Sequence, residues 1–250
     1  MSKIEVMFDL LIVLMKDTMR ILPDVKFDRG YRVHRAVMAL YASIIENTDS
    51  TMILYQAKKS AGIDIILRTN LEAYVDLVNL CSNEDYYNQM LALYHKDWLE
   101  LTQRGLDGNP YLEFFKKDPE AAKTLEEHRT ALAELQKLGR TATIFERFQM
   151  AGMEDVYRSV YKNLCSHTHN NIKALADQHF HGATGEEVEV VIFAPMGNEA
   201  LLSSLDQFVV ILATAGHIVH DYFQSPSAKE ATAFHERRTD LQSVFDDEED

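Results

Sequence analysis

The sequence predicts an all-α protein: a single-domain helical bundle with a small β-hairpin excursion near residues 179–194. Leu, Ala, Met, Glu and Lys, which favour helices, fill long stretches in which apolar residues recur every three or four positions. Only five prolines and ten glycines interrupt the 250 residues, and none of them forms a linker-like cluster. We therefore assign residues 1–237 to one helical domain and residues 238–250 to the end of the last helix and an acidic, disordered tail.

The apolar periodicity and the capping residues place the individual elements in order. Helices are predicted over residues 4–22, 27–46, 51–60, 63–81, 83–104, 119–138 and 144–150, through the segment around Tyr161, and over 198–223 and 227–245. Residues 48–51 offer caps between the second and third of these helices, and residues 105–110 form a loop. Apolar and polar residues alternate only over 186–193, which predicts a strand paired with residues 179–181.

Charge and cysteine content indicate which partners and which cell compartment to expect. The net charge is −14, from 39 acidic and 25 basic residues, which argues against broad adhesion to nucleic acid or to anionic membranes. No run of about 18 apolar residues suggests a membrane span, and the start of the chain lacks a secretory signal. With only two cysteines and no export signal, we expect a cytoplasmic protein without a membrane partner.

The segment from Tyr161 to Asn171 concentrates side chains capable of chemistry. On one helix, Tyr161, Cys165, His169 and Ile172 would share a face, since residues three or four apart are neighbours there. His167 would point about 200° away from His169. His169 is therefore either a core histidine satisfied by a hydrogen bond or a residue of a pocket. Nucleophilic catalysis by Cys165 or Ser166 with a histidine is a further alternative, against the usual role of a helical cysteine as a small core residue.

A polar stripe marks the otherwise apolar helix predicted over 63–81. Asp64, Arg68, Glu72 and Asp76 follow one another at steps of four residues. The stripe is either a solvent-facing ladder of weak ion pairs or the lining of an interior cleft. In a cleft, Arg68 would be a planar donor suited to phosphate or carboxylate.

Two further groups of residues invite a binding role. Arg29, Arg32 and Arg35 recur every three residues and form either a solvated face or a phosphate-binding edge. Six of the ten histidines fall between residues 167 and 220, which raises a metal-site alternative. Besides His169, these are His167, His179, His181, His217 and His220. No established metal-binding motif accompanies them, so we assign no metal and no cofactor.

Two spaced motifs carry a resemblance to a known family. Leu67-Arg68-x-x-x-Glu72-Ala-x-Val75-x-Leu77 is followed about ninety residues later by Tyr161-x-x-Leu164-Cys165-x-x-Thr168-His169. This pattern resembles an uncharacterised bacterial family of α-helical domains over residues 30–223. The resemblance implies that Arg68, Glu72, Tyr161 and His169 share a pocket. Cys165 stands where the family more often has serine, which argues against a nucleophile there.

Such domains look loosely like the HEPN helical proteins, many of which are metal-independent ribonucleases of defence systems. The HEPN spacing of Arg, four to six residues and His is matched by Arg29 and His34, although Gly30 replaces the usual polar residue. By this resemblance we expect a nucleic-acid-processing or nucleotide-binding domain in bacterial defence or stress, with RNA or a nucleotide as partner and with self-association. Arg68 would hold phosphate, and His169 would act as acid or base. The alternatives are a non-catalytic interaction module and a metal-dependent hydrolase built on the histidines.

Overall fold

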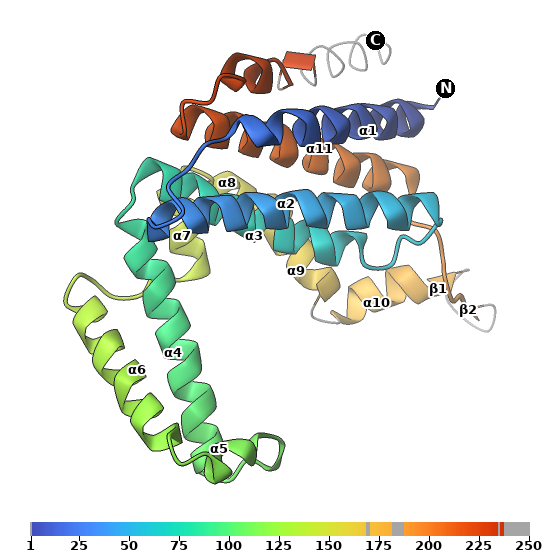
Figure 1. The fold of residues 1–250 in the computed structure, drawn as a ribbon. Coiled ribbons are helices and arrows are strands. Elements are labelled where there is room, and N and C mark those ends of the chain that lie inside the picture. Colours follow the sequence, from blue (N-terminus) through green and yellow to red (C-terminus); the bar gives the residue numbers. More distant parts are fainter. Residues whose placement is uncertain (1, 169–170, 182–187, 235, 238–250) are drawn as a thin grey trace. The chain divides into compact units, whose positions relative to one another are not determined.

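The computed structural model describes residues 2–168, 171–181, 188–234 and 236–237, and it is all-α apart from one small hairpin (Figure 1). The α-helices are α1 (Lys3–Ile21), α2 (Arg32–Gln56), α3 (Ile63–Ser82), α4 (Tyr86–Leu106), α5 (Phe114–Lys117), α6 (Ala121–Gln136), α7 (Ile144–Met150), α8 (Glu154–Val156), α9 (Lys162–Thr168), α10 (Ile172–His179) and α11 (Asn198–Tyr222). Shorter turns are η1 (Leu22–Asp24), η2 (Pro110–Leu112) and η3 (Tyr157–Tyr161). The predicted fold class is confirmed.

The chain groups into two compact units. One contains residues 1–81 and 148–250, and the other contains residues 82–147. A single domain over 1–237 stays a prediction beside this grouping, and residues 238–250 lie outside the described part of the chain.

The long helix α11 forms the centre of the first unit. It packs along α1 on one side and against α2 on another (Figure 1). Leu205, Phe208 and Leu212 are completely buried, as are Leu11 of α1 and Val37 of α2. Among the described residues, α11 is the one helix long and apolar enough to cross a membrane, but 56% of its apolar window is buried inside the protein. This burial is typical of a core helix, because a lipid-facing helix exposes its apolar surface.

Helix α2 corrects the predicted break near residue 48. A single helix runs through Thr48 and Ser50, where two helices were expected. The Thr48 hydroxyl donates to the Ile44 carbonyl at 2.7 Å, and the Ser50 hydroxyl donates to the Glu46 carbonyl at 2.9 Å. These hydroxyls therefore bond back to the preceding turn instead of capping a new helix. Asn70 of α3 also donates to Thr48, at 3.4 Å, which fixes α3 against α2.

The second unit is an antiparallel hairpin of α4 and α6 (Figure 1). Helix α4 includes Gly105, which the sequence placed in a loop. A Cβ atom at this position would lie 2.5 Å from Phe115, so only glycine lets the phenyl ring pack against the helix. Close packing, not chain reversal, explains this glycine.

The predicted hairpin is confirmed but is shorter than expected. Strands β1 (Phe180–His181) and β2 (Glu189–Val190) pair antiparallel, with Phe180 opposite Val190. Val190 and Ile192 are exposed, so the alternating pattern does not mark a face turned to the core of the described structure.

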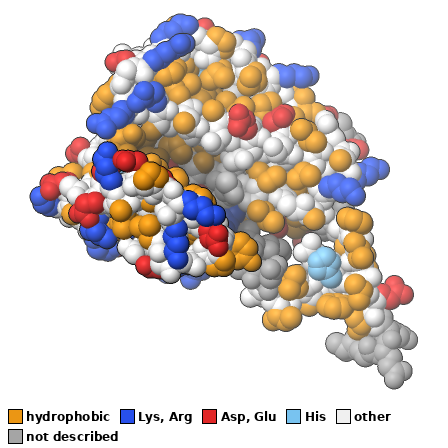
Figure 2. Space-filling view, turned by 60° about the horizontal axis from the view of Figure 1, so that its bottom comes forward, with side chains coloured by type: hydrophobic (Ala, Val, Ile, Leu, Met, Phe, Trp, Pro, Cys, Tyr) orange, Lys and Arg blue, Asp and Glu red, His pale blue; other side chains and the backbone are white. Residues whose placement is uncertain are grey.

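On the face shown in Figure 2, Lys and Arg side chains are scattered among acidic and apolar ones.

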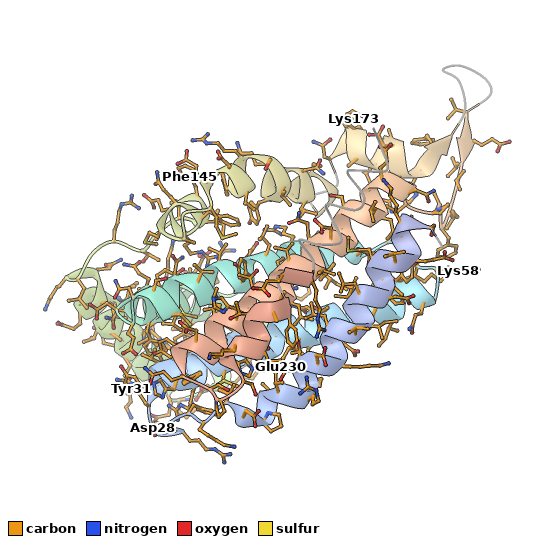
Figure 3. The ribbon with its side chains drawn as sticks, turned by 90° about the horizontal axis from the view of Figure 1, so that it is seen from above. Asp28, Tyr31, Lys58, Phe145, Lys173 and Glu230 are labelled. Atoms are coloured by element: carbon orange, nitrogen blue, oxygen red, sulfur yellow. The ribbon has the colours of Figure 1, made fainter. Side chains whose placement is uncertain are left out.

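The end of the described chain packs against α1. Residues 228–234 are helical, and Glu230 accepts hydrogen bonds from Arg20 (Figure 3). Arg237 donates to Asp17 at 2.8 Å. These contacts hold the last described segment to α1.

Candidate functional site

Three of the four predicted site residues meet in the first unit. The Arg68 Nη2 atom donates to the Tyr161 hydroxyl oxygen at 3.1 Å and lies 3.1 Å from Glu72 Oε1. The Tyr161 hydroxyl in turn donates to Glu72 Oε1 at 2.8 Å. Guanidinium, phenol and carboxylate thus form a closed hydrogen-bonded ring, which we call the Arg–Glu–Tyr cluster.

The backbone presents Tyr161 through an unusual helical turn. Residues 157–161 form a π-helix, in which the Lys162 amide reaches back to the Tyr157 carbonyl. Such a turn contains more residues than an α-helical turn and often marks a functional site, because it redirects a side chain. The Tyr161 ring also packs against buried Phe148, with ring centroids 4.9 Å apart. The phenol is therefore held at both its ring and its hydroxyl.

The cluster is partly shielded from water. Tyr161 is only 4% exposed, whereas the Arg68 and Glu72 side chains are 27% and 31% exposed. Burial raises the pKa of Tyr161, and the hydrogen bond to Glu72 raises it further, so the phenol keeps its proton at neutral pH. The hydrogen bond to Tyr161 raises the pKa of Arg68. Arg68 Nε is buried and has no hydrogen-bond partner among the described residues, which leaves one donor unsatisfied.

The rest of the polar stripe is half-buried, as a cleft would require. Asp64, Arg68, Glu72 and Asp76 all have intermediate exposure. Asp64 Oδ1 accepts a hydrogen bond from Ser204 of α11 at 3.2 Å. Because Asp64 and the cluster bond to other helices, the stripe is not simply a solvent-facing ladder on α3.

A cavity of about 510 Å³ lies next to this stripe. Leu67 of α3 and Leu164 of α9 line it, and they precede Arg68 and Cys165 in the chain. Ser60 also lines the cavity, and its hydroxyl donates to the Ala194 carbonyl at 3.2 Å. The polar lining residues are Ser60, Asp64, Asn163, Asp177, Gln178, His179, Ser203, Ser204 and Gln207. None of the described lining residues is Lys or Arg.

The predicted face of the Tyr161 segment is only partly confirmed. Tyr161 and Leu164 are buried and Cys165 is half-buried, but Ile172 is 82% exposed. Ile172 begins α10, which Asn171 caps by accepting from the Lys173 amide at 3.0 Å. The face therefore ends before Ile172 because a new helix starts there. His169 lies outside the described residues, so its place beside the cluster stays a prediction.

The three arginines predicted to bind phosphate lie at the start of α2. Arg32 is its first residue, Arg29 lies in the preceding loop, and all three side chains, Arg35 included, are exposed. Figure 3 shows the same corner of the unit through Asp28 and Tyr31. Among the described residues these arginines contact neither the Arg–Glu–Tyr cluster nor the cavity lining. They form a separate basic edge.

His34 beside that edge has a structural role. Its Nδ1 atom accepts a hydrogen bond from the Asp28 amide at 3.2 Å. The imidazole also meets the rings of Tyr31 and Phe223 edge-on. This acceptor role requires a neutral ring whose proton is on Nε2.

The histidines of the metal alternative have separate partners. His179 contacts the Val191 carbonyl at 3.2 Å, His217 contacts Thr232 at 3.0 Å, and the buried His220 contacts Ser225 at 2.9 Å. The side chains of His167 and His181 lie outside the described part. Within that part, no three His, Cys, Asp or Glu residues gather in a metal-binding arrangement.

One pair of histidines has no counterpart in the sequence analysis. His95 of α4 and His128 of α6 lie with their Nδ1 atoms 2.8 Å apart. They are 33 residues apart in the chain, and only the pairing of the two helices brings them together. No local spacing signals such a contact.

Comparison with known proteins gives a family but no characterised relative. Residues 34–187 match the model of a "Family of unknown function (DUF5677)". This match contains Arg68, Glu72, Tyr161 and His169, and it excludes Arg29 and Arg32. No curated protein and no solved structure matches the chain. The predicted resemblance to an uncharacterised helical family is confirmed over the matched residues.

Proposed function

The chain belongs to this family, and we propose that it binds a nucleotide or a single strand of RNA at the Arg–Glu–Tyr cluster and cleaves RNA without a metal. In this proposal Arg68 holds a phosphate, and His169 supplies the acid or base. We place the protein in the cytoplasm of a bacterium, as a self-associating component of a defence or stress response. The observation that carries the proposal is the meeting of Arg68, Glu72 and Tyr161 from two distant helices.

The state of Arg68 supports an anion-binding role. Glu72 and Tyr161 both engage Nη2, which fixes the plane of the guanidinium. Fixing this plane reduces the entropy lost when a phosphate binds. Because the Arg68 side chain is 27% exposed, a phosphate oxygen can reach the guanidinium from solvent.

The cavity supports a nucleoside as the rest of the ligand. Its volume of about 510 Å³ falls in the range of small-molecule sites. Asn163 and Gln207 offer amides, and Ser203 offers a hydroxyl, which suit the edges of a base or a ribose. Because no described lining residue is Lys or Arg, the phosphate would lie at Arg68, one helical turn from Asp64 of the lining.

Cleavage without a metal follows a balanced internal displacement. The ribose 2′-oxygen loses its proton to a base and forms a bond to the adjacent phosphorus, and the bond from phosphorus to the 5′-oxygen breaks. The departing oxygen takes up a proton, so the products carry a 2′,3′-cyclic phosphate and a 5′-hydroxyl. A histidine suits the proton transfer, because its pKa lies near neutrality. Arg68 would stabilise the charge on the phosphate oxygens.

A non-catalytic interaction module is the second candidate. The same hydrogen bonds favour it, because a purely structural role would also explain them. In that role Arg68, bonded to both Glu72 and Tyr161, would hold α3 against the Tyr161 segment and bind no ligand. The two candidates differ in whether Arg68 binds a ligand.

The deciding experiment combines nucleotide binding with RNA cleavage. Purified protein is titrated with nucleoside monophosphates by calorimetry and is incubated with labelled RNA in the presence of a chelator. We expect binding in the wild type that Arg68→Gln weakens at least about tenfold, since a charge-assisted bond contributes about 1.5–3 kcal/mol. We expect His169→Ala to abolish cleavage while binding remains. The cyclic-phosphate ends distinguish this reaction from metal-dependent hydrolysis, which a chelator stops.

The matched control is Arg158→Gln. Arg158 forms an i,i+4 pair with Glu154 at 2.6 Å, as Arg68 does with Glu72, but its side chain is 59% exposed. This variant should bind and cleave as the wild type does. Absence of both binding and cleavage in the folded wild type would favour the interaction module. Cleavage that survives His169→Ala would refute the role assigned to His169.

A further inference from the structure

The hairpin of α4 and α6 contains a close pair of imidazoles. The Nδ1 atoms of His95 and His128 are 2.8 Å apart, and the two ring centroids are 5.1 Å apart. One Nδ1 atom donates a proton to the other, so this contact requires that at least one ring be neutral. Both side chains are half-buried and therefore accessible to small ions from solvent.

Aromatic rings hold the pair in place. Trp98 stacks on His128 with an angle of 6° between the ring planes. Tyr94 meets His95 and His128 edge-on, at centroid distances of 5.1 and 5.7 Å. These contacts limit the rotation of both imidazoles, so two nitrogen ligands are already brought to one place on two helices.

We propose that His95 and His128 form a two-imidazole binding site for a borderline divalent transition metal, with Cu²⁺ and Ni²⁺ preferred over Zn²⁺. Neutral imidazole nitrogen is a good ligand for all three ions, and affinity at such a site rises from Ni²⁺ to Cu²⁺ and falls again at Zn²⁺. Water would complete the coordination. The site is separate from the proposed RNA site and does not depend on it.

The two nitrogens are already almost as close as two ligands of one metal ion. With a metal–nitrogen bond of about 2.0–2.1 Å, two ligands at a right angle are about 2.9 Å apart, and two at the tetrahedral angle are about 3.3 Å apart. The observed 2.8 Å, which is the length of the hydrogen bond between the rings, is close to the right-angle distance. Square-planar and tetragonal geometries are those of Cu²⁺ and Ni²⁺. For both Nδ1 atoms to bind one metal, the donating ring would carry its proton on Nε2 instead, and a small rotation of each ring would turn the two Nδ1 lone pairs to the ion.

A bound ion would join α4 to α6, because each helix supplies one of the two imidazoles. It would stabilise the hairpin because it binds the folded form.

Trp98 provides a direct readout, because it is the only tryptophan of the chain and stacks on a ligand. Untagged protein is titrated with Cu²⁺ and Ni²⁺ at neutral pH, and Trp98 emission is followed. In the wild type we expect saturable quenching at a single equivalent of Cu²⁺. In His95→Ala and in His128→Ala the Cu²⁺ concentration at half-maximal quenching should rise at least about tenfold, because even the loss of a group that orients a ligand costs about 10–100-fold in metal affinity. Electron paramagnetic resonance of the Cu²⁺ complex should show two nitrogen ligands.

The matched control is His217→Ala, which removes an imidazole that bonds to Thr232 elsewhere in the chain. Its quenching midpoint should equal that of the wild type. Circular dichroism shows whether each variant is folded, and His95→Gln with His128→Gln replaces any alanine variant that is not. An unchanged midpoint in the folded double variant would overturn the proposal, as would the absence of saturable quenching in the wild type.

Discussion

The Tyr161 hydroxyl takes part in two hydrogen bonds with charged partners, one accepted from Arg68 and one donated to Glu72. Bonds to charged groups contribute more than neutral ones, about 1.5–3 kcal/mol each when buried. Solvent reduces this contribution here, because both charged side chains are about a third exposed. The hydroxyl therefore stabilises the fold and also orients the proposed phosphate ligand.

Tyr161→Phe tests this double role. The substitution keeps the ring packed on Phe148 and removes only the hydroxyl. We expect the free energy of unfolding, measured by urea denaturation, to fall by about 1–2 kcal/mol. Tyr111→Phe is the control, since Tyr111 is 90% exposed, and it should leave stability unchanged. A Tyr161→Phe protein as stable as the wild type would show that the hydroxyl contributes nothing.

At the scale of the element, the start of α7 is fixed by a reciprocal cap. Glu146 accepts hydrogen bonds from the Thr143 amide at 2.8 Å and from the Thr143 hydroxyl at 2.9 Å, and from Arg140 at 2.8 Å. The hydrogen bond to Arg140, with those to the Thr143 amide and hydroxyl, lowers the pKa of Glu146 to about 2. A carboxyl whose pKa is lowered on folding stabilises the folded state above its ordinary pKa and loses this effect as pH falls.

Glu146→Gln should therefore destabilise the protein in a pH-dependent way. We expect the variant to melt at a lower temperature than the wild type at neutral pH. The difference should shrink as the pH falls from the ordinary value of 4.5 to about 2. Calorimetry over this pH range measures it, with Glu127→Gln as an exposed control. A difference that stays constant down to pH 2 would contradict the assignment of the low pKa to Glu146.

Some of these helical elements could be predicted from the sequence, and others could not. Helices α1 and α3 follow from apolar periodicity, because each buries one regular face. The prediction of a helix break near Thr48 was wrong, because a threonine hydroxyl can either cap a helix or bond back to the preceding turn within one. Tertiary packing decides which of the two occurs. The π-helical turn at Tyr157–Tyr161 was not predicted, since single-turn insertions leave no periodic signal. Arg68, Glu72 and Tyr161 were grouped by family resemblance, and the structure brings them together.

At the scale of the whole molecule, charge limits how RNA could bind. The chain has a net charge of −14, and four exposed or half-buried arginines are the basic positions that we assign to phosphate: Arg29, Arg32, Arg35 and Arg68. Binding should therefore depend on a few local contacts, without broad electrostatic attraction. The division into two compact units and the pairing of His95 with His128 depend on long-range contacts, which local periodicity does not encode.

The salt dependence of RNA binding tests whether only a few local contacts hold the RNA. Each phosphate contact with a single strand contributes about −0.7 to the slope of log affinity against log salt concentration, so four contacts give a slope of about −3 at most. Filter binding over a range of KCl concentrations measures the slope, and Arg68→Gln should make it shallower by about 0.7. A slope much steeper than this would reveal a basic surface other than the one proposed.

The π-helical turn has a consequence for the evolution of this family. A protein with one residue fewer between positions 157 and 161 would wind this segment as an ordinary α-helix. A π-turn contains one residue more than an α-turn, so removing that residue would leave the phenol facing nearly the same way. A one-residue deletion within this turn would thus keep the cluster, and relatives that share the deletion should retain the tyrosine, the arginine and the glutamate together.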